Sequence, residues 1–264
     1  QAAHDRLTAS PLSMRRPLSD DNSWLNCNGG DGRQDIYLLT SQEIGSTVFA
    51  GVTTPIPTLA SPFATFIGIN ISVLSGDQFE EAAVHEYMHA IQAAYINYLK
   101  ADFAIDATAE WAVGHVLPGN KAYKKYAEHL LHDMRRPLWS QYDPFRRYGD
   151  YLFFQFISSF TDADGQGFGG PVVVRQFWEI LDAQPAFEVN PLTALNFSLP
   201  RGLSETWARF IILAWNQAPV DNFLSFDGQQ ASSPASRTSS ITLSTPTTIF
   251  RTPIDRDGRP ALLA

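Results

Sequence analysis

The five residues His85-Glu86-Tyr87-Met88-His89 combine the side-chain types that metal-assisted hydrolysis requires. On a helix, positions four apart differ by about 40° and one turn of rise, so both imidazoles can reach one metal ion. A catalytic zinc ion takes three protein ligands and leaves a fourth position for water. Glu86 follows the first histidine and could accept a proton from that water. The pattern therefore predicts zinc bound by His85 and His89, with Glu86 as catalytic base.

A third protein ligand must come from elsewhere in the chain, and an acidic segment follows the histidines. In Asp106-Ala107-Thr108-Ala109-Glu110-Trp111, the two acids are four apart on a predicted helix and share one face. One carboxylate can bind the metal while the other accepts a hydrogen bond from a ligand histidine. The spacing leaves open whether Asp106 or Glu110 is the ligand.

A β-strand is expected directly before the histidine helix. Between Phe66 and Leu74, branched apolar residues alternate with Gly, Asn and Ser, as in a half-buried strand. Helical periodicity then continues from Asp77 to Lys100, and Asp77 and Glu80 have the spacing of a capping box. One apolar stripe of this helix is expected to face the core and consists of Val84, Met88, Ile91, Tyr95 and Tyr98.

The rest of the chain suggests a small sheet followed by helices. Two strands at 36–40 and 47–53 are predicted to pair with each other. Further helices are predicted at 102–113, 121–134, 148–160, 171–182, 191–197 and 203–216, and short strands at 241–243 and 248–250.

The predicted fold class is α+β, with a small mixed or antiparallel sheet and the histidine helix packed against a mostly helical C-terminal lobe. The expected organisation is an irregular lead-in at 1–33, an α+β lobe at 34–100, a helical lobe at 101–225, and a Ser/Thr/Pro-rich linker with short strands at 226–264.

The composition restricts the classes of partner. With 44% hydrophobic and 17% charged residues, the chain has the profile of a folded globular protein. Its net charge of -8 disfavours contact with a phosphate backbone, so no nucleic-acid partner is expected. No apolar run approaches the roughly 18 residues of a membrane span.

The composition also bears on localisation. Few lysines and many Ser, Thr and Asn are typical of a secreted protein, and the start at Gln1 suggests a processed chain.

Together, the His85-Glu86-x-x-His89 motif and the Asp-Ala-Thr-Ala-Glu-Trp segment resemble the gluzincin zinc metallopeptidases. The resemblance is greatest to secreted bacterial members with a helix of the form Glu-[Gly/Ala]-Thr-Ala-x-Trp. It implies that Asp106, where the family usually has Glu, is the third zinc ligand, with Glu110 as the alternative. It extends from about Asp35 to Trp215, but only these two motifs are specific.

Related zinc peptidases also use a Tyr or His from the downstream helical lobe to donate a hydrogen bond to the oxyanion. The resemblance thus gives Tyr148, in the segment Tyr148-Gly149-Asp150-Tyr151, as a candidate for that role.

The sequence therefore predicts a zinc-dependent metallopeptidase that acts on peptide or protein substrates. The strand at 66–74 is expected to line the cleft, where an extended peptide could add as a further strand. Two alternatives remain open: a zinc-binding protein without catalysis, and an interaction module of a larger chain. The presence of Glu86 argues against a purely structural metal site, which needs no base.

Overall fold

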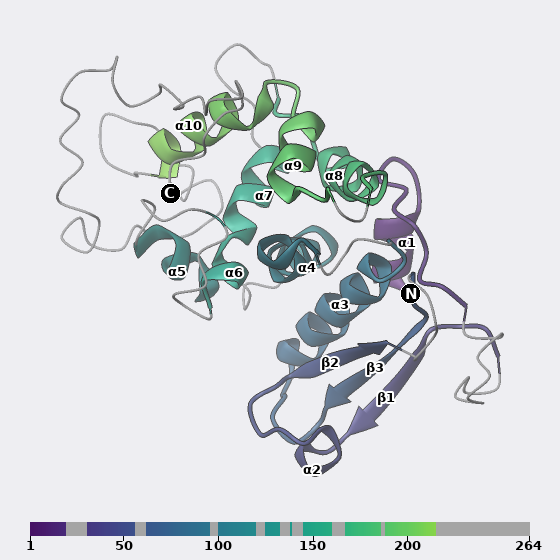
Figure 1. Cartoon of the computed structure of the whole chain (residues 1–264). Coiled ribbons are helices and arrows are strands. Elements are labelled where there is room, and N and C mark those ends of the chain that lie inside the picture. The colour runs from purple at the N-terminus through teal and green to yellow at the C-terminus, as the bar shows by residue number, and fades with distance from the viewer. Residues whose placement is uncertain are drawn as a thin grey trace.

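The computed structural model describes residues 1–19, 31–55, 62–95, 100–119, 125–132, 138, 145–159, 167–185 and 188–214. These residues form a mixed three-stranded sheet followed by a mostly helical region (Figure 1). The predicted α+β class is confirmed. The predicted strands at 241–243 and 248–250 lie outside the described residues, as does the whole of 226–264.

The sheet consists of β1 (Asp35–Leu39), β2 (Gly51–Pro55) and β3 (Thr65–Asn70), in the order β1-β3-β2. The central strand β3 is parallel to β1 and antiparallel to β2. The prediction that the first two strands pair with each other is therefore wrong. No tight hairpin turn joins them, because the short helix α2 (Ser41–Ile44) follows β1 and begins with a capping box between Thr40 and Glu43.

Helix α3 (Asp77–Gln92) covers one face of the sheet and carries the histidine motif. Its Ala82 and Ala90 pack against Ile67 and Ile69 of β3, which are fully buried. In Figure 1, α3 lies between the sheet and the helical region. One side of α3 therefore contacts strands β2 and β3, and another side contacts the helices.

The start of α3 differs from the prediction. Gly76 is the N-cap, and no side chain caps the helix, so Asp77 and Glu80 do not form the predicted capping box. Both acids instead lie in the first turn, where negative charge is favoured by the helix dipole. Helix α3 ends at Gln92, so the prediction that it continues to Lys100 is wrong. The predicted stripe is confirmed on the helix by the burial of Val84, Met88 and Ile91, and Tyr95 is buried just beyond its end. Tyr98 lies outside the described residues.

The helical region is built around α4 (Asp102–Val116), which contacts α1, α3, α6 and α7. The helix predicted at 102–113 therefore continues for three further residues, to Val116. The helix predicted at 148–160 is divided, because a turn at Asp150 separates α6 from α7. The other helices of this region are α5 (Ala127–His132), α6 (Arg146–Gly149), α7 (Tyr151–Ser159), α8 (Val172–Asp182), α9 (Pro191–Ser198) and α10 (Gly202–Ala214).

The N-terminal residues, predicted as part of an irregular lead-in, contain helix α1 (Ala2–Thr8). Leu7, Leu12 and Met14 are buried in the core formed with α3 and α4. Burial of these apolar side chains outweighs the weak helical signal of the local sequence. Among the described residues, no helix is long and apolar enough to cross a membrane.

Candidate metal centre

The packing of α3 against α4 brings three predicted ligands to one point. His85 Nε2 and His89 Nε2 lie 3.0 Å apart, and Asp106 Oδ1 lies 3.7 and 3.5 Å from them. The Asp106 and His85 side chains are each 10% exposed. These three residues could hold a metal ion. The two histidines were predicted from their spacing, which left Asp106 and Glu110 as alternatives for the third ligand.

The three separations agree with tetrahedral coordination. If each bond to the metal is about 2.0–2.1 Å, neighbouring ligand atoms of a tetrahedral site lie about 3.3 Å apart. The observed values of 3.0, 3.5 and 3.7 Å are all close to this distance. A small adjustment of the side chains is therefore enough to accommodate an ion.

The second ring nitrogen of each histidine has its own partner. His85 Nδ1 lies 3.0 Å from Glu110 Oε1, and His89 Nδ1 lies 2.8 Å from Gln92 Oε1. The Gln92 amide is oriented because its Nε2 donates to Ile105 O, at 2.9 Å. When Nδ1–H donates to such a partner, the Nε2 lone pair is free to bind a metal.

This geometry separates the two acids of α4. Asp106 faces the Nε2 atoms of both histidines, whereas Glu110 faces Nδ1 on the other side of the His85 ring. Glu110 is 3% exposed, and its Oε2 has no hydrogen-bond partner among the described residues. The arrangement matches a division in which one carboxylate meets the ion and the other orients a histidine.

The charges of the group stabilise each other. Burial lowers the pKa of His85, but hydrogen bonds to Asp106 and Glu110 raise it well above its usual value. Burial raises the pKa of Asp106, yet the hydrogen bonds from His85 and His89 outweigh this and hold it below its usual range. A cation bound at Nε2 of His85 must displace a proton, so metal binding competes with protonation.

Glu86 is held on the sheet side of α3. Its Oε2 accepts a hydrogen bond of 2.7 Å from Thr53 Oγ1, which also lies 2.8 Å from the Glu86 backbone oxygen. Gly51 of the same strand leaves room for the carboxylate, since an added Cβ would lie 2.7 Å from Glu86 Cγ. Strand β2 thus fixes the predicted base through two residues that the motif did not indicate.

The predicted residue Tyr148 also lies at this site. Its ring is stacked on that of His85, with centroids 5.8 Å apart and an interplanar angle of 18°. The ring of Tyr126 is also stacked on that of Tyr148, with centroids 4.9 Å apart. Burial and the charge of Asp106 raise the pKa of Tyr148, so its hydroxyl stays protonated and can donate a hydrogen bond.

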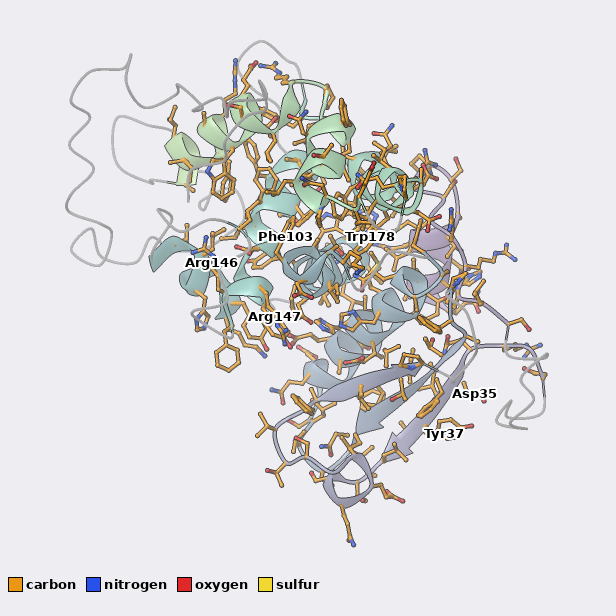
Figure 2. All side chains as sticks on the ribbon, in the orientation of Figure 1. Asp35, Tyr37, Phe103, Arg146, Arg147 and Trp178 are labelled. Carbon is orange, nitrogen blue, oxygen red and sulfur yellow. The ribbon has the colours of Figure 1, made fainter. Side chains whose placement is uncertain are left out.

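Arg147 is a further residue at the site that sequence reasoning missed. Its Nε contacts Oδ2 of Asp106, while Oδ1 faces the histidines. Figure 2 shows Arg147 on the side of the helical region that lies toward the sheet. In the sequence, only its position next to Tyr148 could have indicated that Arg147 lies at the site.

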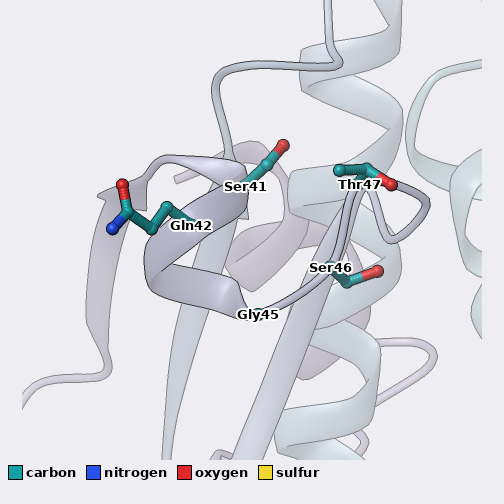
Figure 3. Close-up of a pocket in the computed structure, with 5 residues that line it drawn as sticks. All are labelled: Ser41, Gln42, Gly45, Ser46 and Thr47. Atoms are coloured by element: carbon teal, nitrogen blue, oxygen red, sulfur yellow. The ribbon is translucent and has the colours of Figure 1, made fainter.

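A surface hollow lies away from the metal group among the described residues. It has a volume of about 660 Å³ and lies at α2 and the loop that follows it (Figure 3). Its lining residues are Ser41, Gln42, Gly45, Ser46 and Thr47. The three residues of the metal group do not line it.

Comparisons with protein-family models, curated proteins and solved structures found no match to this chain. The gluzincin resemblance therefore remains a prediction that rests on the two motifs. The structure shows a buried group of two histidines and one aspartate that could hold a metal ion.

The contact between His85 and Glu110 predicts an effect on metal binding. We expect Glu110→Gln to weaken zinc binding about 10- to 100-fold, because the amide is a poorer acceptor for the ligand histidine. Competition with a chromophoric chelator measures this change. The matched control is Glu179→Gln on α8, which alters an exposed glutamate far from the group in the sequence. Equal affinities in the two variants would contradict an orienting role for Glu110.

Proposed function

We propose that this protein is a zinc-dependent metallopeptidase. The observation that carries the proposal is the group formed by His85, His89 and Asp106, together with the buried Glu86 that follows His85 on the same helix. Zinc held by these three residues would supply a Lewis acid and lower the pKa of a bound water to about 7. The proposed substrate is a peptide bond in a peptide or protein.

Glu86 would move the proton. As general base it accepts a proton from the attacking water, and as general acid it passes that proton to the leaving amine. Thr53 donates to Oε2 of the carboxylate, and Oε1 would be the oxygen that accepts the proton of the water. The buried position of Glu86 supports catalysis over a structural metal site, because a structural site needs no held base.

The proposed position of the substrate changes with the sheet order. The sequence placed the peptide along the strand at 66–74, but β3 is central and pairs on both sides. Its main-chain groups are therefore already engaged. Strand β2 is an edge of the described sheet and carries Thr53 beside Glu86. We place an extended peptide along β2, held by main-chain hydrogen bonds.

Tyr148 is the proposed oxyanion donor. Its stacking on His85 places it next to the metal group, and its raised pKa keeps the hydroxyl proton available. A donor that is preorganised for the developing negative charge stabilises the transition state more than the ground state.

The central test compares Glu86→Gln with the wild type on a broad library of quenched fluorescent peptides. We expect cleavage to fall by at least about 100-fold, since the amide cannot act as a base. Zinc content should stay the same, because Glu86 is not a ligand. Glu80→Gln, an exposed change in the first turn of the same helix, is the control.

Two results would overturn the proposal: no cleavage of any library member by zinc-loaded wild type, or unchanged cleavage by Glu86→Gln. Zinc binding without cleavage would instead favour the non-catalytic alternative. If His85→Ala and the wild type were equally free of metal, the interaction-module alternative would be favoured.

A second prediction concerns the hydrogen bond from Thr53 to Glu86. We expect Thr53→Val to lower kcat about 10-fold with little change in zinc content, because a charged hydrogen bond that orients the base is lost. Thr54→Val is the matched control, since alternate residues of β2 face opposite sides of the sheet. A loss of the same size in the control would point to the strand and not to the hydroxyl.

A third prediction concerns the Tyr148 hydroxyl. We expect Tyr148→Phe to lower kcat by about 100-fold while KM changes little, because the bond to the oxyanion forms mainly in the transition state. Steady-state kinetics on a cleaved peptide separate the two constants. Tyr37→Phe on β1 controls for loss of a tyrosine hydroxyl. An effect on KM alone would show that Tyr148 binds substrate and does not stabilise the oxyanion.

A further inference from the structure

We propose that Arg147 is a positioning residue that assigns different tasks to the two oxygens of Asp106. The guanidinium Nε contacts Oδ2, whereas Oδ1 lies 3.7 and 3.5 Å from the Nε2 atoms of His85 and His89. With Oδ2 occupied, only Oδ1 is directed at the metal group. This inference rests on the proposed metal site, although it does not require peptide cleavage.

The carboxylate needs such a partner because its terminal torsion is soft. Rotation about the last bond of an aspartate side chain is broad and roughly two-fold, so either oxygen, or both, could turn toward a cation. Asp106 is 10% exposed, which leaves little water to hold Oδ2. A charge-assisted hydrogen bond from a planar guanidinium fixes both the distance and the orientation.

The chain positions Arg147 through its buried neighbour. Arg146 is 2% exposed, and its Nε donates to Asp150 Oδ1 at 2.9 Å while its Nη1 approaches Leu130 O at 3.4 Å. The contact with Leu130 joins α6 to α5, and Arg147 follows Arg146 directly. In Figure 2, Arg146 lies within the helical region and Arg147 nearer the sheet.

The two arginines differ in a way that makes the inference testable. The Arg147 side chain is 55% exposed, whereas that of Arg146 is almost completely buried. Arg147 therefore contributes little to the core, and its replacement should leave the fold intact. Its position is also maintained by the Tyr148 ring, whose centroid lies 5.5 Å from the guanidinium carbon.

An exposed ion pair often contributes almost no stabilising free energy. The experiment must therefore distinguish a positioning role of Arg147 from an ion pair without effect. We expect Arg147→Gln, in the full chain, to bind zinc about 10-fold more weakly than the wild type in competition with a chromophoric chelator. Arg147→Lys keeps the charge but lacks the planar fork, so an intermediate loss is expected. Arg209→Gln is the matched control: this arginine is 39% exposed and pairs with Glu205 on α10.

A double-mutant cycle shows whether Arg147 acts through Asp106. In an Asp106→Asn background, Arg147→Gln should cause no further loss of zinc affinity. Cobalt substitution gives a second readout, because the intensity of its visible bands depends on coordination number. We expect Arg147→Gln to change this spectrum, while Arg209→Gln leaves it unaltered.

Unchanged zinc affinity and an unchanged cobalt spectrum in Arg147→Gln would overturn the inference, and so would an equal loss in the Asp106→Asn background. If the wild type binds no metal, the inference and the proposed function both fail. Metal binding that weakens in Arg147→Gln without any peptide cleavage would support the inference and reject only the peptidase.

Discussion

The packing of α3 against α4 is the interaction on which the rest of the structure depends. Buried charged and polar groups are costly unless they are partnered. Here the partners come from the facing helix, as in the contacts of His85 with Glu110 and of Gln92 with Ile105 O. A shift of one helix along the other would break both contacts. The register that satisfies them also brings the three candidate ligands together.

The site draws its support from separate elements on its two sides. Helix α4 contacts His85 through Glu110, and α6 contacts Asp106 through Arg147. Glu86 is instead held by β2, through the hydroxyl of Thr53. The group that could hold a metal ion and the carboxylate of Glu86 can therefore be altered by separate substitutions.

The neighbourhood of the site also carries unfavourable electrostatics. Burial, followed by the charge of Glu110, raises the pKa of Glu81, and Lys125 at 3.6 Å offsets this only in part. Among the described residues, neither Glu81 Oε2 nor Glu110 Oε2 has a hydrogen-bond partner. Buried polar atoms without hydrogen-bond partners lower the stability of the fold, and they are typical of functional sites. A bound cation would reduce the repulsion between these acids.

The sequence by itself determined the features that depend on local period. The helical repeat fixes His85 and His89 on one face with Glu86 beside them, and it places Asp106 and Glu110 on a face of the next helix. The alternation of 66–74 likewise predicted a strand, although the strand ends at Asn70 and Ile71 and Val73 are exposed beyond it. The overall α+β class followed. Only the tertiary structure decided that Asp106 faces the Nε2 atoms, that Thr53 and Arg147 join the site, and that β3 is central. These contacts join residues far apart in the chain, so they depend on strand order and helix register, which no local pattern encodes.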